Sequence, residues 1–308
     1  MIDLSTTYMG IPLKNPIVPS ASPLSAELDT IKRMEDAGAA AVTLPSLFEE
    51  QVEFEAESLS YFLELGTYSY AEALTYFPPL KEFRRGPKEY VEHIRQACEA
   101  SLRRLNTDYI DLYYFHKDDY DPGKAAEVRD FLEKLVEEGK IRWYGWSTVN
   151  PEGARVFAQG QHCTAIQHWM NMGTDMPEML AICDQYDLAS VVRSPLGSGN
   201  MTGKFTRDSR FPQDDWRRDW NSPSEFLIQR RQRVAEIGKF FAETGDARTL
   251  AQIALAWIWT RSDRTIPIPG FKTVAQVKEN IQAMEFGLLS NEQMKRIEET
   301  FGRTPVTS

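Results

Sequence analysis

Two short segments in the second half of the chain carry residues suited to hold phosphate groups. Residues 194–199 (SPLGSG) have small side chains that leave their backbone amides open to close approach by a pyrophosphate. Residues 266–273 (IPIPGFKT) precede a predicted helix whose N-terminal amides and dipole favour an anion. In this second segment, Lys272 would add a positive charge and Thr273 a hydroxyl group. Each segment by itself is also typical of an ordinary turn or helix cap.

Both segments follow short apolar runs, which alternate with amphipathic stretches along most of the chain. The predicted strands are residues 17–21, 40–44, 109–116, 141–148, 164–169, 189–194 and 265–268. The predicted helices are residues 27–37, 88–105, 125–138, 224–244, 250–260, 274–284 and 291–301. Nearly all-apolar strands that alternate with helices indicate a parallel sheet covered by helices. The favoured fold class is a TIM-type (β/α) barrel; the alternative is an open doubly wound sheet, although no G-x-G-x-x-G follows any strand.

The barrel is expected to be irregular, because seven clear parallel strands are predicted where a regular barrel has eight. Residues 49–85 contain no clear helix–strand unit, and Gly66 and Pro78-Pro79 interrupt them. A loop of that length is unusual inside a compact domain. Either it hides a strand, in residues 68–76, or the barrel lacks one. Residues 4–16 predict an N-terminal β-hairpin around Gly10 that would plug the bottom of the barrel.

Five runs near the predicted strand ends resemble those of the aldo-keto reductases, in the same order. They are residues 97–116 (ACEASLRRLNTDYIDLYYFH), 139–150 (GKIRWYGWSTVN), 165–171 (AIQHWMN), 193–205 (RSPLGSGNMTGKF) and 266–280 (IPIPGFKTVAQVKEN). The resemblance covers residues 96 to about 305. It implies a cofactor, NADP(H), that lies across the barrel mouth without a Rossmann domain.

The resemblance also implies which residues contact that cofactor. Ser147, Thr148 and Gln167 would meet the carboxamide of the nicotinamide. Arg193 stands where many members have an aromatic ring that stacks on the nicotinamide, and a planar guanidinium can also stack. The other implied contacts are Ser194, Leu196, Gly197 and Ser198 along the pyrophosphate, Gly270 before the helix, Lys272, Thr273 and Gln276 at the 2′-phosphate, and Glu279 and Asn280 near the adenine. A cation at Lys272 would favour NADP over NAD.

His116 matches the histidine that orients the substrate carbonyl in this family. The family's other catalytic residues are a tyrosine and an aspartate in a D-x-A-x-x-Y-G pattern, and a lysine that ends the third strand. No such pattern is recognisable here, although Tyr61, Tyr68, Tyr70 and Tyr76 lie in the corresponding part of the chain. We therefore expect the catalytic tyrosine, lysine and aspartate to be absent.

Residues 1–95 resemble a different barrel family, the dihydroorotate dehydrogenase-like flavoproteins. The matching runs are residues 3–25 (DLSTTYMGIPLKNPIVPSASPLS), 28–51 (LDTIKRMEDAGAAAVTLPSLFEEQ) and 62–77 (FLELGTYSYAEALTYF). That resemblance implies FMN near Ala21, Ser22 and Ser46, held weakly because the family's later flavin contacts are replaced. The interpretation is a chimera, in which one barrel domain (residues 1–308) combines parts 1–95 and 96–308. The two parts would join within a helix, around residues 90–100.

Three functions compete on this basis. The first is an NADP(H)-binding, aldo-keto reductase-like oxidoreductase scaffold with little or no carbonyl reductase activity. The second is an active NADPH-dependent reductase of small-molecule aldehydes or ketones that uses a substitute acid. The third is an FMN-binding dehydrogenase-like protein or a non-catalytic engineered chimera.

Composition limits the other possibilities. The formal net charge of −10 disfavours nucleic acid as a partner. Neither a secretory signal nor an apolar stretch long enough for a bilayer is visible, so we expect no membrane association and a cytoplasmic location. Cys98, Cys163 and Cys183 have no metal-site or disulfide spacing, which predicts buried thiols and no bound metal. A homo-oligomer is possible, because an incomplete barrel would expose a strand edge.

Overall fold

The computed structural model describes residues 6–8, 11–20, 28–43 and 87–304, apart from 207, 214 and 223. Its centre is a parallel sheet in the order β3-β4-β5-β6-β7. These strands are β3 (Ile110–Phe115), β4 (Ile141–Ser147), β5 (Cys163–Trp169), β6 (Ala189–Arg193) and β7 (Thr265–Pro267). All five were predicted from the apolar runs. The predicted hairpin is also confirmed, as β1 (Thr6–Tyr8) pairs antiparallel with β2 (Ile11–Leu13).

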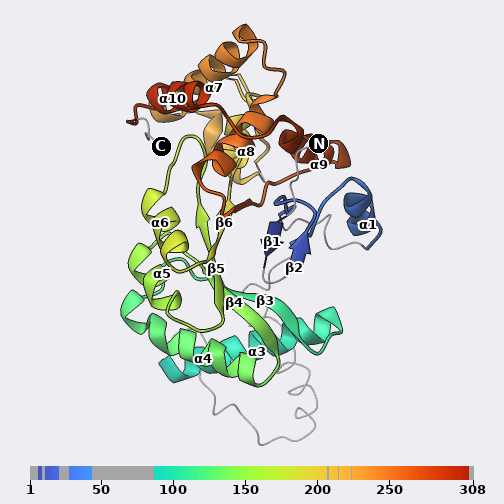
Figure 1. Ribbon diagram of the computed structural model, residues 1–308, viewed down its shortest axis with the longest axis vertical. Helices are drawn as coiled ribbons and strands as arrows, with labels where there is room; N and C mark the ends of the chain where they lie inside the picture. Colours follow the sequence, from blue (N-terminus) through green and yellow to red (C-terminus); the bar gives the residue numbers. More distant parts are fainter. Residues whose placement is uncertain are drawn as a thin grey trace, which may run out of the picture.

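Helices follow the strands and cover the outer side of the sheet, as Figure 1 shows for α3 to α6. The α-helices described are α1 (Leu28–Asp36), α3 (Pro87–Leu105), α4 (Ala125–Glu137), α5 (Pro151–Phe157), α6 (Pro177–Gln185), α7 (Glu225–Glu243), α8 (Leu250–Arg261), α9 (Val274–Gln282) and α10 (Asn291–Thr300). Short 3₁₀ segments are η3 (Pro122–Lys124), η4 (Gly197–Thr202), η5 (Trp216–Asn221) and η6 (Ala283–Phe286). None of these helices combines the length and apolar character needed to cross a bilayer.

Two N-terminal segments lie next to the end of β7 without joining the sheet as strands. The Ser20 amide donates to the Pro269 carbonyl at 3.2 Å, and the Thr43 amide donates to the Pro19 carbonyl at 3.0 Å. Residues 17–20 and 41–43, which belong to the predicted strands 17–21 and 40–44, therefore lie next to one another, but neither segment forms a strand in the structure. The interval proposed to hide an eighth strand lies outside the described residues.

The inward face of this arrangement forms its own apolar core. Buried Val18, Ala165, Val191 and Ile266 pack together, with Ala41, Leu112, Tyr114, Ala189 and Ile268 partly buried against them. These side chains come from segments across the whole described chain, from residue 18 to residue 268. Alternation along a strand explains the pattern, because successive side chains point to opposite faces: Val191 lies in this inner core and Val192 in an outer one.

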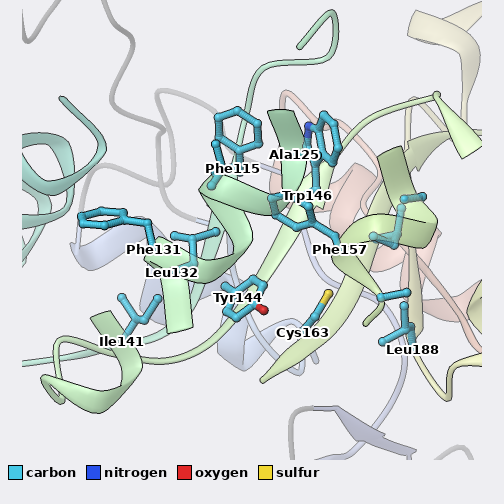
Figure 2. Close-up of a cluster of buried hydrophobic side chains, with 14 of the residues drawn as sticks. Phe115, Ala125, Phe131, Leu132, Ile141, Tyr144, Trp146, Phe157, Cys163 and Leu188 are labelled. Carbon is cyan, nitrogen blue, oxygen red and sulfur yellow. The ribbon is translucent and has the colours of Figure 1, made fainter. Parts of the chain in front are cut away.

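The largest outer core lies between β3 to β5 and the helices that cover them (Figure 2). Trp146 packs on Phe157 with ring centroids 4.7 Å apart, and Phe115 lies 5.4 Å from the same indole. The three cysteines are buried and unpaired, as expected. Burial raises the pKa of the Cys98 thiol to about 11, which makes it an unreactive core residue.

We predict that Gly145→Ala destabilises the fold. A Cβ atom at this position in β4 would lie 2.4 Å from the Ala165 carbonyl oxygen of β5 and 2.8 Å from a Tyr114 ring carbon. Overpacking against backbone should lower the free energy of unfolding by about 2 kcal/mol, measured by urea denaturation. The control is Gly270→Ala, whose Cβ would meet only Ser20 Oγ, at 3.8 Å. Equal stability of the two variants would contradict the tight β4–β5 contact.

A second prediction concerns His168, which is fully buried on β5 and hydrogen-bonded through Nε2 to Ser190 Oγ at 2.8 Å. Burial lowers its pKa to about 4. The unfolded chain binds a proton below about pH 6.5, whereas the folded protein does not until about pH 4, so stability falls as pH drops through this window. Between pH 7 and 5, the natural protein should lose about 2 kcal/mol more than His168→Gln. Parallel stability curves for the two proteins would refute this origin of the acid sensitivity.

Candidate functional site

A cavity of about 690 Å³ opens at the carboxyl ends of β6 and β7 and at the start of α9. Its lining includes nine of the residues that the sequence singled out: Arg193, Ser194, Leu196, Ser198, Gly270, Lys272, Gln276, Glu279 and Asn280. The two segments suited to hold phosphate, which are far apart in the sequence, thus face one space. The cavity also includes Ser20 from the N-terminal part and Thr202, Lys204 and Arg217 from the long connection between β6 and α7.

The loop after β6 is tightly curled, which exposes its backbone to the cavity. Ser194, Gly197, Ser198 and Gly199 all have positive φ, between 54° and 95°. The Gly197 amide donates to the Ser194 carbonyl at 2.9 Å, closing the turn. A Cβ atom on Gly199 would lie 2.8 Å from side-chain atoms of Lys204 and Phe205. Small residues are needed here because the backbone is left-handed and a neighbouring chain segment approaches closely.

The loop before α9 presents a helix N-terminus to the same cavity. Thr273 is the N-cap, and its side chain accepts a hydrogen bond from the Gln276 amide at 3.3 Å. The Lys272 amide donates to Gln276 Oε1 at 2.6 Å, so the Gln276 side chain folds back over the first turn. Lys272 itself is exposed. The first turn of a capped helix with an adjacent lysine is favourable for an anion.

Two cations in the cavity wall were not predicted from the sequence. Lys204 follows the glycine loop directly, and its pKa is lowered by desolvation and then by the charges of Arg217 and Lys272. Arg217 is the second residue of η5 and forms an ion pair with Asp215, the N-cap of that segment, at 2.5 Å. Lys204 belongs to the run 193–205, and its place after a glycine-rich loop could have marked it as a phosphate-binding cation. No local pattern marked Arg217.

Aromatic side chains pack against Arg217. Phe205 lies 5.0 Å from Phe211, and Trp220 completes the cluster 5.7 Å from Phe211, measured between ring centroids. The Arg217 guanidinium lies 4.9 Å from the Phe211 ring. This part of the connection therefore packs around a cation at the cavity edge.

Arg193, Lys204, Arg217 and Lys272 together give the cavity a positive lining. Arg193 and Arg217 each pair with a carboxylate, Asp118 and Asp215 respectively. Within the described chain, Lys204 and Lys272 have no such carboxylate partner. The cavity can therefore accept an anion with more than one negative charge, although the whole chain is acidic.

Ser147 and Gln167 lie near the carboxyl ends of β4 and β5. They are register partners, and Ser147 Oγ donates to Gln167 Oε1 at 2.9 Å. Thr148 is fully buried, donates through Oγ1 to the Asp118 carbonyl at 3.3 Å and accepts from the Asn150 amide at 3.0 Å. None of the three is in the cavity lining. Nor are Gly197 and Thr273, which shape its two loops instead.

His116 follows the last residue of β3 and is exposed at the same sheet edge. The surrounding protein lowers its pKa, first by desolvation and then through the positive charge of Arg193, whereas Asp118 opposes this shift. A neutral imidazole at neutral pH is the consequence. A neutral ring keeps one N–H donor for an acceptor such as a carbonyl oxygen.

Other predicted features fall outside the described residues. These are Ala21, Ser22 and Ser46, expected near FMN, and the tyrosines Tyr61, Tyr68, Tyr70 and Tyr76. In the portion of the chain that the structure covers, no group of three or more His, Cys, Asp or Glu side chains is placed to hold a metal ion.

Comparison with known proteins identifies the family. The model of the aldo/keto reductase family matches residues 86–301. Among curated proteins, the chain is 32% identical over 216 residues to the aldo-keto reductase yakc [NADP(+)] of Schizosaccharomyces pombe, and 31% identical over 217 residues to the probable aldo-keto reductase 1 of Glycine max. These matches cover 68% and 70% of this chain, but only 62% and 61% of the relatives.

Solved structures agree on the fold. The glycerol dehydrogenase AKR11B4 of Gluconobacter oxydans superposes with a TM-score of 0.72, covering 100% of this chain and 98% of that one, at 22% identity. The aldo-keto reductase AKR11C1 of Bacillus halodurans, in its apo form, has a TM-score of 0.53 over 71% of each chain, at 26% identity. The predicted TIM-type α/β barrel fold is therefore confirmed, with five parallel strands in the described part of the chain. The chain belongs to the aldo/keto reductase family.

Proposed function

We propose that this oxidoreductase-family protein binds NADP(H) in the positively lined cavity at the carboxyl edge of its sheet. The observation that carries the proposal is the convergence of Lys204, Arg217 and Lys272 with a curled glycine loop and a capped helix N-terminus. This donor set fits a dinucleotide with a further phosphate, because backbone amides and cations face the same space. The name of the yeast relative, which specifies NADP(+), supports the same cofactor.

Each part of the cofactor has candidate partners in this set. Ser194, Leu196, Gly197 and Ser198 would follow the pyrophosphate, with Lys204 and Arg217 as its cations. Lys272, Thr273 and Gln276 would hold the 2′-phosphate, and Glu279 and Asn280 the adenine, with Gly270 allowing close approach. Ser147 and Gln167 would hydrogen-bond the nicotinamide carboxamide, beside Arg193. We assign Thr148 a supporting role, because its hydroxyl is already used within the protein.

The chemistry that this cofactor supplies, when bound, is hydride transfer to a carbonyl carbon. His116 would orient the carbonyl oxygen of a small-molecule aldehyde or ketone through a ring N–H. The alkoxide that forms must also receive a proton. Because the sequence shows no recognisable family tyrosine, lysine or aspartate pattern, we propose that turnover is slow. A missing general acid lowers the rate by about 10²–10⁴-fold.

We also infer, from the sequence resemblance alone, that residues 1–95 have a flavoprotein-like origin within a single barrel domain. The family match begins at residue 86, near the helix in which we expected the two parts to join. Weak FMN binding is the corresponding minor hypothesis. Absorbance near 450 nm in the purified protein would support it, and a colourless protein would count against it.

Lys272→Ala should weaken NADPH binding about tenfold while leaving NADH binding nearly unchanged. The reason is that the lysine and the start of α9 would hold the 2′-phosphate, which NADH lacks. Titration of tryptophan fluorescence with each nucleotide measures both affinities. Lys278→Ala is the matched control, because Lys278 is exposed on α9 and is absent from the cavity lining. A similar loss for both nucleotides would contradict 2′-phosphate recognition by Lys272.

His116→Ala should abolish whatever aldehyde-dependent NADPH oxidation the protein shows and leave NADPH affinity within about twofold. In the proposed complex the ring contacts the substrate carbonyl and not the cofactor phosphates. Loss of absorbance at 340 nm with a panel of small aldehydes measures the activity, and fluorescence titration the affinity. Rapid turnover by the natural protein would reject the slow scaffold in favour of an active reductase. Unchanged turnover in the variant would remove His116 from the site.

A further inference from the structure

Asp118 and Arg193 form an ion pair that reaches across the carboxyl edge of the sheet. Arg193 ends β6, whereas Asp118 lies just after β3, with β4 and β5 between these strands. One terminal nitrogen of Arg193 donates to Asp118 Oδ2 at 2.5 Å. The arginine side chain is 30% exposed and the aspartate side chain 43% exposed. The pair thus links the end of β6 to the loop after β3, although β3 and β6 are not neighbours in the sheet.

Asp118 is held in place by the end of β4 and the loop that follows it. Its other carboxylate oxygen, Oδ1, accepts a hydrogen bond from the Val149 amide at 2.8 Å. Its carbonyl accepts from Thr148 Oγ1 at 3.3 Å, and Trp146 Nε1 donates to the neighbouring Lys117 carbonyl at 3.0 Å. The carboxylate therefore has a defined position before it meets the arginine.

Arg193 borders the cavity and is held at one end only. Its Nε atom is buried and has no hydrogen-bond partner among the described residues. Without Asp118, the guanidinium would sample several rotamers, because the arginine side chain is long and has a large rotamer entropy. The ion pair limits that freedom and sets the orientation of a flat, charged group at the cavity wall.

We propose that Asp118 is a positioning residue, which holds the Arg193 guanidinium in the plane needed to stack against the nicotinamide. This inference rests on the proposed binding of NADP(H). Asp118 contacts neither cavity loop and acts only through Arg193. The negative charge of Asp118 also raises the pKa of His116, which opposes the lowering by Arg193.

The test compares NADPH with 2′-phospho-ADP-ribose, which has the same phosphates and adenine but no nicotinamide. Asp118→Asn should weaken NADPH binding about tenfold and leave 2′-phospho-ADP-ribose binding within about twofold, both measured by calorimetry. The second ligand also shows that the variant is folded. Asp119→Asn is the matched control, because its carboxylate is 86% exposed and pairs only with Lys117, at 3.6 Å, among the described residues. It should change neither affinity.

NMR titration of His116 in the ligand-free protein gives an independent measurement. Asp118→Asn should lower the imidazole pKa, because a negative charge is lost and Arg193 stays. Unchanged NADPH affinity in Asp118→Asn would overturn the positioning role while leaving the cofactor site intact. An equal loss of affinity for both ligands would also overturn it, because it would indicate that the substitution disturbs the whole site. Failure of the natural protein to bind either ligand would reject the proposed function itself.

Discussion

The parallel pairing of β3 to β7 is the constraint on which the site depends. In register, it places the carboxyl ends of five strands at one edge of the sheet. His116, Ser147, Gln167 and Arg193 meet there although they come from four separate strand–helix units. The tight β4–β5 contact at Gly145, where no Cβ fits, shows how closely this register is held.

Positive charge is concentrated at this edge, although the chain as a whole has a net charge of −10. Two of the four cavity cations are fixed in place by carboxylates, since Asp215 anchors Arg217 and Asp118 anchors Arg193. Lys204 and Lys272 are left to face the cavity. The depressed pKa of Lys204 reflects its desolvation and the closeness of the other cations, and a bound anion would relieve their repulsion.

Features set by local chemistry could be predicted from the sequence, and features set by distant contacts could not. The start of the helix at residue 274 and the glycine loop after β6 are local, and both were recognised, although Thr273 was expected at a phosphate and is the N-cap. The apolar run at residues 17–20 was also recognised, but not its place next to Pro269, because pairing joins residues far apart in the chain. Asp118 acquires its position through contacts with residues 148 and 149, which are distant in the sequence, whereas Arg217 is held by nearby Asp215 but reaches the cavity only through tertiary packing. Thr148 was expected at the cofactor, but its hydroxyl donates a hydrogen bond to the Asp118 carbonyl in the loop after β3.

Soaking crystals of the protein with NADPH would locate the nucleotide. We expect the 2′-phosphate at Lys272 and the first turn of α9, the pyrophosphate along residues 194–199, and the nicotinamide beside Arg193. A nucleotide bound elsewhere on the surface, or an empty cavity at millimolar NADPH, would contradict this placement.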